Sequence, residues 1–338
     1  MAPVAAPPRE APFEPHPLLL GPHAQTLAAK FLRPDDGVTY RREVLPTADG
    51  DAVELDFVDV PGVASWDSLG DAAPIGLVLH GLEGCARTGY AVQTYKEFAA
   101  RGVRPVGLNF RTCGGRPPSL PRAYHAGETT DPAFVVETLR SRWPDAPLLG
   151  VGFSLGGNVL LKLLGELGSD APFVAAASVS APFDLAACVD RIESGFSRVY
   201  SAYLRRRLQK KLVLRRDELS DHARVDEALA ARTLRGFDHH LTAPLHGFTG
   251  ADDYYSRSSS AGFVADIAVP TLLVRSLDDP FLARDDVPHA AIAGNPHVDA
   301  RLTPHGGHVA FVARGADGGL GWWAEQTVAT WLTRTGVP

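Results

Sequence analysis

The chain has 338 residues, of which 45% are hydrophobic and 21% charged, a composition typical of a folded globular protein. Its net charge of −6 excludes a general attraction to nucleic acid. Three cysteines without C-x-x-C spacing argue against a disulfide framework and a structural zinc site. No apolar run approaches the roughly 18 residues that a membrane span needs. The proline-rich start lacks the basic and apolar regions of a signal peptide, so we expect a cytoplasmic protein.

Residues 1–35 are interpreted as an N-terminal arm, because their first 22 positions are rich in proline and favour an extended chain. Two β-rich runs follow, at about 38–45 and 52–60. The Asp49-Gly50 pair between them is typical of a tight turn. The pattern therefore predicts a β-hairpin after the arm.

From residue 75 onward, short apolar runs alternate with stretches of helical spacing. Each apolar run has the length of a buried strand, and each following stretch has the period of a helix that covers a sheet. This alternation predicts an α/β fold with a mostly parallel sheet and helices on both faces. In chain order the segments are 75–79, 90–100, 103–110, 132–142, 148–153, 156–167 and 173–179.

The alternation breaks at residues 183–246, which have a helical pattern and no good strand. We interpret the chain as one α/β core, formed by residues 36–182 and 247–338, into which residues 183–246 insert a helical cap. Eight cations and no acid lie between Arg198 and Arg216 in this insertion. Such a stretch is typical of the solvated face of a helix, and the alternative is a weak contact with anionic lipid headgroups.

The strongest chemical signal is the segment Gly152-Phe153-Ser154-Leu155-Gly156. It lies between the apolar run at 148–151 and the helical run at 158–167. Glycines two residues on either side of a serine let the chain pass through a sharp strand-to-helix turn that exposes the hydroxyl above the sheet. Ser154 is therefore the predicted nucleophile.

A serine hydroxyl attacks only when a base takes its proton, and that base needs an acid to orient it. On this topology the acid follows the serine along the chain, on a loop after a strand. Asp278 and Asp279 both follow the strand expected at 271–275, and only one of them can point inward. Asp279 is preferred because Pro280 restricts its backbone.

The base is expected last in the chain, after the strand at 298–302. His305 and His308 are the candidates there. Gly306-Gly307 gives the backbone freedom to turn the next residue into the site, so His308 is preferred.

The loop after the strand at 75–79 begins with His80-Gly81-Leu82. Hydrolases of this topology supply one oxyanion N–H group from this loop and a second from the residue after the nucleophile. The predicted donors are therefore the backbone N–H groups of Leu82 and Leu155. His80 precedes the nucleophile in the chain, so we expect it to brace the loop.

Other segments add to this pattern: Pro22-His23-Ala24-Gln25-Thr26, His80-Gly81-Leu82-Glu83-Gly84, Gly156-Gly157-Asn158, Thr242-Ala243-Pro244-Leu245-His246-Gly247-Phe248, Asp253-Tyr254-Tyr255, Asp279-Pro280-Phe281 and Gly306-Gly307-His308-Val309. With them the chain resembles the YheT-type branch of the α/β-hydrolases almost from end to end. The resemblance implies hydrolysis of carboxylic esters, with lipid-like substrates. Because the acid of this branch stands before Pro-Phe, the resemblance also favours Asp279.

These observations predict a serine carboxylesterase that cleaves small-molecule or lipid-like esters through Ser154, His308 and Asp279. The alternatives are an acyltransferase or thioesterase with the same triad, or a binding module of the same fold without turnover. The sequence contains no dinucleotide or phosphate-binding glycine motif and no oxygen-ligand loop. We therefore expect no cofactor, no metal and no nucleic-acid partner.

Overall fold

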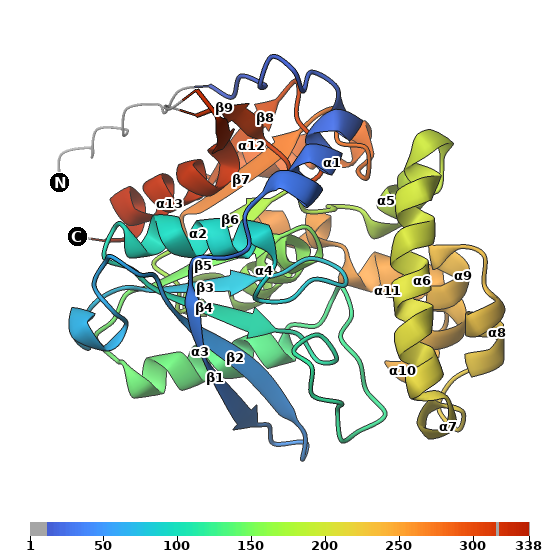
Figure 1. The fold of residues 1–338 in the computed structure, drawn as a ribbon. Coiled ribbons are helices and arrows are strands. Elements are labelled where there is room, and N and C mark those ends of the chain that lie inside the picture. The colour runs from blue at the N-terminus through green and yellow to red at the C-terminus, as the bar shows by residue number, and fades with distance from the viewer. Residues whose placement is uncertain (1–11, 316–317, 338) are drawn as a thin grey trace.

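The computed structural model describes residues 12–315 and 318–337, so the first eleven residues of the predicted arm lie outside the described residues. The strands are β1 (Thr39–Pro46), β2 (Ala52–Asp59), β3 (Ile75–Leu79), β4 (Arg104–Asn109), β5 (Leu148–Phe153), β6 (Ala175–Val179), β7 (Thr271–Ser276), β8 (Val298–Thr303), β9 (Val312–Arg314) and β10 (Leu320–Trp322). Within the described residues, the first eight form one sheet in the order β1-β2-β4-β3-β5-β6-β7-β8 (Figure 1). β1 and β2 form the predicted hairpin.

The sheet is parallel from β4 to β8, and β2 is the one strand of this sheet that runs in the opposite direction, antiparallel to both β1 and β4. Every residue of β3 to β7 is buried, as expected for strands covered on both faces. Successive side chains point to opposite faces, so Leu77 and Leu79 join one apolar core and Val78 joins the other. The predicted mostly parallel sheet is therefore confirmed.

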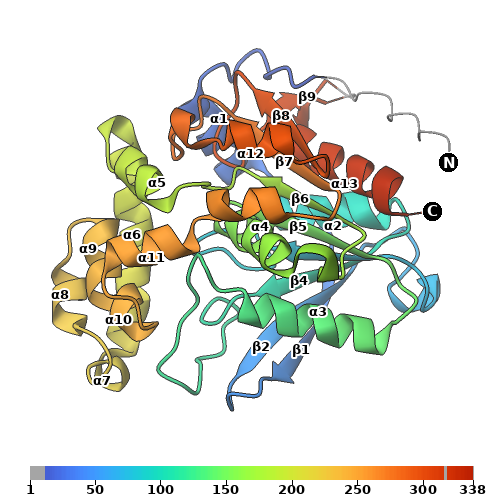
Figure 2. The same ribbon diagram turned by 180° about the vertical axis from the view of Figure 1, so that it is seen from behind.

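Helices cover both faces of this sheet (Figures 1 and 2). One face carries α2 (Gly89–Ala99) and α13 (Trp323–Gly336), which contact each other. The opposite face carries α3 (Thr130–Arg142) and α4 (Leu155–Leu167). The shorter α12 (His289–Gly294) lies before β8. The layers leave the carboxyl ends of the parallel strands pointing toward one edge, where the loops that follow them gather (Figure 1).

A group of helices stands beyond that edge, between β6 and β7 in the chain (Figure 1). Leu212, Leu219, Phe237 and Leu241 belong to a small apolar core within it, separate from the two cores of the sheet. The helices are α5 (Leu185–Ile192), α6 (Arg198–Leu214), α7 (Arg216–Leu219), α8 (Val225–Ala230), α9 (Leu234–Phe237) and α10 (Ala243–Leu245), and α11 (Ala251–Ser258) leads back to the sheet. They occupy the segment in which the sequence predicts a helical insertion.

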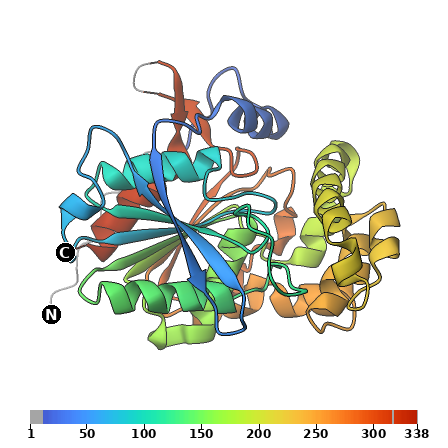
Figure 3. The same ribbon diagram turned by 60° about the horizontal axis from the view of Figure 1, so that its bottom comes forward.

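The described part of the N-terminal segment contains a helix, α1 (Pro22–Leu32), which the proline content did not suggest. Pro22 stands at the first helical position, where its fixed φ angle favours a helix and its missing N–H group is not needed. The helix packs near β9, and Ala29 shares a small apolar core with Ala310 and Val312 (Figure 3). The proline content indicated an extended chain only for residues 1–22, so the helix over residues 22–32 is an element that sequence reasoning did not predict.

Candidate active site

Ser154 lies on the turn between β5 and α4. Its backbone angles, φ 53° and ψ −120°, lie in a region that non-glycine residues rarely adopt. A Cβ atom at Gly152 would lie 2.4 Å from the carbonyl oxygen of Gly156, and a Cβ atom at Gly156 would lie 2.5 Å from the carbonyl oxygens of Leu79 and His80. Both positions require glycine because backbones meet there, which explains the spacing recognised in the sequence.

Three of the predicted site residues meet at the carboxyl ends of their strands. His308 Nε2 lies 2.8 Å from Ser154 Oγ. On the other side of the ring, His308 Nδ1 lies 3.0 Å from Asp279 Oδ2 and 3.2 Å from Oδ1. Asp279 is 2% exposed, and its Oδ1 also accepts a hydrogen bond from the backbone N–H of Phe281 at 2.8 Å. This is the hydrogen-bonded order that a nucleophile, a base and an orienting acid require.

Asp278 and His305, the two competing candidates, form a separate pair outside this arrangement. Asp278 Oδ2 lies 3.3 Å from His305 Nδ1, and the His305 side chain is 63% exposed. Of these two neighbouring carboxylates, only that of Asp279 contacts the imidazole ring of His308.

An aromatic contact that sequence reasoning did not anticipate holds the plane of the His308 ring. The ring of Phe281 lies flat against it, with 4.0 Å between the centroids and 7° between the planes. Tyr200 of α6 packs in turn on Phe281, with 4.9 Å between their centroids. The segment Asp279-Pro280-Phe281 therefore supplies both a carboxylate and a flat surface to the imidazole. Because the two residues are two positions apart on one loop, a sequence pattern alone could have pointed to Phe281.

The backbone N–H groups of Leu82 and Leu155 face no acceptor within the part of the chain that the structure describes. The N–H groups on either side of Leu82 are both occupied, because Gly81 donates to the Tyr90 hydroxyl and Glu83 to the Tyr124 hydroxyl, each at 2.8 Å. Leu155 is the first residue of α4, so its N–H group is one of those that a helix leaves without a partner.

His80 is fully buried under this loop, and both of its ring nitrogens form hydrogen bonds with backbone groups. Its Nε2 accepts a hydrogen bond from the backbone N–H of Phe110 at 3.1 Å, which leaves the proton on Nδ1 to be donated to the Gly81 carbonyl at 2.8 Å. Burial lowers the pKa of His80 to about 4, so the ring is neutral near pH 7. These contacts fit a residue that braces the loop.

A pocket of about 680 Å³, including its part open to solvent, extends from Leu82 and Leu155 toward α6. Most of its wall is apolar. The helices between β6 and β7 contribute Leu208, Leu212, Leu219, Phe237, Leu241 and Leu245.

Several polar groups lie in the same wall. Burial lowers the pKa of His125 to about 4 and that of His246 to about 3, and the two rings lie 4.4 Å apart. Burial also raises the pKa of Asp238 to about 6, although the Thr242 and Tyr255 hydroxyls donate to its carboxylate. Both histidines are therefore neutral near pH 7.

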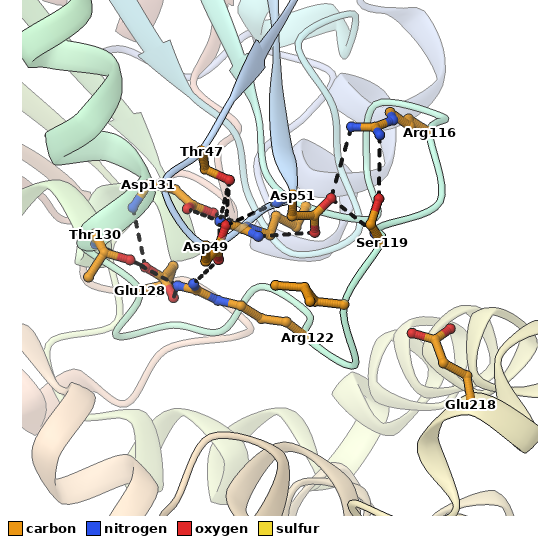
Figure 4. Close-up of polar contacts among 12 residues, drawn as sticks. Thr47, Asp49, Asp51, Arg116, Ser119, Arg122, Glu128, Thr130, Asp131 and Glu218 are labelled. Carbon is orange, nitrogen blue, oxygen red and sulfur yellow. Dashed lines mark hydrogen bonds and ion pairs between the residues drawn. The ribbon is translucent and has the colours of Figure 1, made fainter.

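Ion pairs fix the loop between β4 and α3 (Figure 4). Tyr124 and His125, which line the pocket, lie on this loop. Arg122 donates to Asp49 at 2.8 Å and to Glu128 at 2.7 Å. Arg111 donates to Asp131 through two nitrogens, at 2.7 and 2.8 Å. The loop is thereby tied to the β1–β2 hairpin and to the start of α3.

The basic stretch of α6 contacts these same loops. Lys211 Nζ lies 2.8 Å from Glu83 Oε1, and Arg207 donates to the Glu83 carbonyl at 2.9 Å. Arg215 donates to the carbonyl oxygens of Leu120 and Arg122 at 2.7 and 2.8 Å. Part of the basic stretch therefore binds α6 to the loops after β3 and β4, and the sequence pattern contained no sign of these distant partners.

No helix in residues 12–315 and 318–337 combines the length and the apolar character of a membrane span. Over the same ranges, no three His, Cys, Asp or Glu side chains are grouped as metal ligands would be.

Comparison with known proteins identifies the family to which the chain belongs. Residues 77–314 match the sequence profile of the family described as alpha/beta hydrolase fold, and the chain belongs to that family. Within it, the chain is a member of the YheT-like branch. It is 36% identical over 319 residues to YheT of Escherichia coli strain K12, which carries the name of an esterase. The aligned region covers 92% of this chain and 90% of that protein. It is 32% identical to the mouse phospholipase ABHD3, over 85% of this chain and 70% of that protein.

A solved structure shows the same fold at much lower identity. The esterase Pf2001 of Pyrococcus furiosus superimposes with a TM-score of 0.54 at 14% identity, over 88% of this chain and 93% of that one.

Proposed function

We propose that the chain is a serine carboxylesterase in which Ser154, His308 and Asp279 form a catalytic triad. Ser154 Oγ attacks the ester carbonyl carbon while His308 Nε2 takes the hydroxyl proton, and Asp279 stabilises the imidazolium. His308 then gives the proton to the departing alkoxide, which leaves an acyl-enzyme ester on Ser154. Water, deprotonated by the same histidine, releases the acid. The proposal is carried by the continuous hydrogen-bonded chain from Ser154 Oγ to the buried Asp279 carboxylate.

The backbone N–H groups of Leu82 and Leu155 are proposed to stabilise the oxyanion that forms during attack. Their lack of a partner among the described residues supports this role. The N-terminal end of α4 adds a partial positive charge beside Leu155. One such donor contributes about 2.7–4 kcal/mol to the stability of a transition state.

Residues 183–246 are proposed to act as a cap that selects the acyl part of the substrate. The pocket between cap and core begins at Leu82 and Leu155 and continues along the apolar side chains of Leu208 and Leu212. An acyl chain is the part of an ester that such a wall favours. The relatives named esterase and phospholipase support a small-molecule or lipid-like ester.

A weak contact of α6 with anionic lipid headgroups is part of the proposal. Arg198 and Arg206 are exposed and have no acid partner in the described part of the chain. Phe196 and Val199, which are close to Arg198 in the chain, are 56% and 58% exposed. Cations next to exposed apolar side chains are typical of helices that lie on membrane surfaces.

The proposal is tested by Ser154→Ala together with a fluorophosphonate probe, which labels activated serines. We expect the wild type to be labelled and to hydrolyse short esters, and Ser154→Ala to lose both properties while keeping its thermal unfolding midpoint. Activity above a few per cent in a folded Ser154→Ala protein would refute the role of Ser154. An added alcohol or thiol that takes most of the acyl group from water would favour the acyltransferase alternative, and preference for thioesters would favour a thioesterase.

A further inference from the structure

The buried face of α1 lies directly against the loop that carries His308. The backbone N–H of His308 donates to Thr26 Oγ1 at 3.0 Å, although 282 residues separate them in the chain. The Thr26 hydroxyl has its own proton committed elsewhere, because it donates to the Pro22 carbonyl at 2.7 Å. Its orientation is therefore set by the helix, and its lone pair faces the histidine loop.

The loop side of this contact has no room for a side chain. A Cβ atom at Gly307 would lie 2.6 Å from Thr26 Oγ1 and 2.8 Å from the backbone nitrogen of Thr26. The backbone of the loop thus touches the backbone of the helix, and any displacement of α1 reaches His308 without a flexible side chain between them.

Gln25 binds the chain just beyond the loop. Its side-chain oxygen accepts from the backbone N–H of Val312 at 2.7 Å, and its NH₂ group donates to the carbonyl oxygens of Val312 and Leu19 at 3.1 and 2.8 Å. Gln25 is fully buried, so water cannot replace these bonds.

Arg33, at the other end of α1, holds the residue that follows His308. It donates to the Val309 carbonyl at 2.7 Å, and its Nε lies 3.3 Å from the buried Glu325 carboxylate. Val309 has φ 51°, a backbone conformation that persists only where its surroundings impose it. The Ser180 hydroxyl accepts from the N–H of the same residue at 3.1 Å.

We propose that Thr26 and Gln25 are positioning residues for His308, so that α1 is a working part of the site. This inference rests on the proposed function, in which His308 is the base. The imidazole must keep its contacts with Asp279 and Ser154 simultaneously. Two of the backbone groups that fix its loop are held by α1, and a misplacement of about 1 Å in such a group can cost about 10²-fold in rate. The Pro22–Thr26 segment recognised in the sequence thereby acquires a physical role.

The test compares Thr26→Val, which keeps the shape and removes the acceptor, with Thr26→Ser, which restores it. Thr138→Val is the matched control, because Thr138 on α3 also donates to the carbonyl four residues earlier and does not contact the histidine loop. We expect Thr26→Val to lose about 10- to 100-fold in kcat, with KM within about twofold, on short and long esters alike. Thr26→Ser should stay within about threefold of the wild type, and Thr138→Val should be unchanged.

Fluorophosphonate labelling and thermal unfolding separate this inference from the proposed function. Thr26→Val is expected to be labelled at least about tenfold more slowly than the wild type, with an unfolding midpoint close to that of Thr138→Val. A labelled wild type together with full activity of Thr26→Val overturns the inference alone. Absence of labelling in the folded wild type overturns the proposed function and this inference with it. If Thr26→Val does not fold, Thr26→Ala, which removes the hydroxyl without adding a methyl group, decides by the same criteria.

Discussion

Replacing Asp279 by asparagine exchanges one carboxylate oxygen for an NH₂ group at nearly constant size. Oδ1 of Asp279 already accepts from the backbone N–H of Phe281 at 2.8 Å, so the amide keeps its oxygen there. The NH₂ group then occupies the position of Oδ2, 3.0 Å from His308 Nδ1. Two donors cannot share a hydrogen bond, so the imidazole proton moves from Nδ1 to Nε2.

A proton on Nε2 faces Ser154 Oγ at 2.8 Å, and the ring can no longer accept the serine proton. We expect kcat/KM to fall by about 10⁴-fold, the loss typical of an orienting acid replaced by its amide. At 1.36 kcal/mol per factor of ten this is about 5.4 kcal/mol of lost transition-state stabilisation.

Asp278→Asn is the matched control, since Asp278 precedes Asp279 on the same loop and contacts His305 instead of His308. It changes only the local potential, so its loss should be less than about tenfold. The assay is hydrolysis of one short chromogenic ester by both variants, with thermal unfolding measured for each. A loss in Asp278→Asn as large as that in Asp279→Asn would refute the tautomer argument, and the reverse ranking would give the role to Asp278.

Leu208→Ala enlarges the pocket and should shift the preferred acyl length upward on a panel of esters of graded chain length. Tyr203→Ala should not shift it, because Tyr203 is 46% exposed and does not line the pocket. A uniform loss of activity across the panel would show that Leu208 has only a structural role. Burial raises the pKa of Asp238 from 3.8 to about 6, so the unfolded chain releases this proton first as pH rises, and the free energy of unfolding should fall between about pH 4 and 6. Urea unfolding of Asp238→Asn across that range should show a smaller fall, and an identical pH profile would contradict the assignment. In vesicle sedimentation, the wild type should bind phosphatidylserine vesicles more strongly than phosphatidylcholine vesicles. The double variant Arg198→Glu, Arg206→Glu should remove this difference. Equal binding of the double variant and the wild type would show that these two residues do not contact lipid.

The parts of the fold that sequence reasoning reached are those with a local signal. The glycines around Ser154 stand where backbones meet, and the spacing that this requires is visible within five residues of the sequence. The strands are short apolar runs because both faces of the sheet are covered, so their alternation with helices can be recognised in the sequence.

The parts that sequence reasoning missed depend on contacts between distant segments. Nothing near Thr26 indicates that its hydroxyl meets a backbone group 282 residues later. Likewise, the sequence of the basic stretch predicts a solvated helix face, because nothing near it in the chain indicates that Lys211 contacts Glu83 and Arg215 contacts the carbonyl of Leu120. The choice between Asp278 and Asp279 depended on both kinds of information. The local effect of Pro280 favoured Asp279 in the sequence, and the structure shows that the carboxylate of Asp279 contacts His308.

The contact between Lys211 and Glu83 limits how freely this insertion can be exchanged between related proteins. Glu83 follows Leu82 in the loop, and its side chain is 1% exposed with α6 in place. A foreign insertion that covers the same loop without a cation would leave a buried carboxylate unpaired, a loss of about 3–5 kcal/mol. A grafted insertion therefore has to carry a lysine or arginine at the place of Lys211 or Arg207, which both lie near this carboxylate, or Glu83 has to be replaced in the recipient. The buried charge of Glu83 therefore limits which insertions can be exchanged between such proteins.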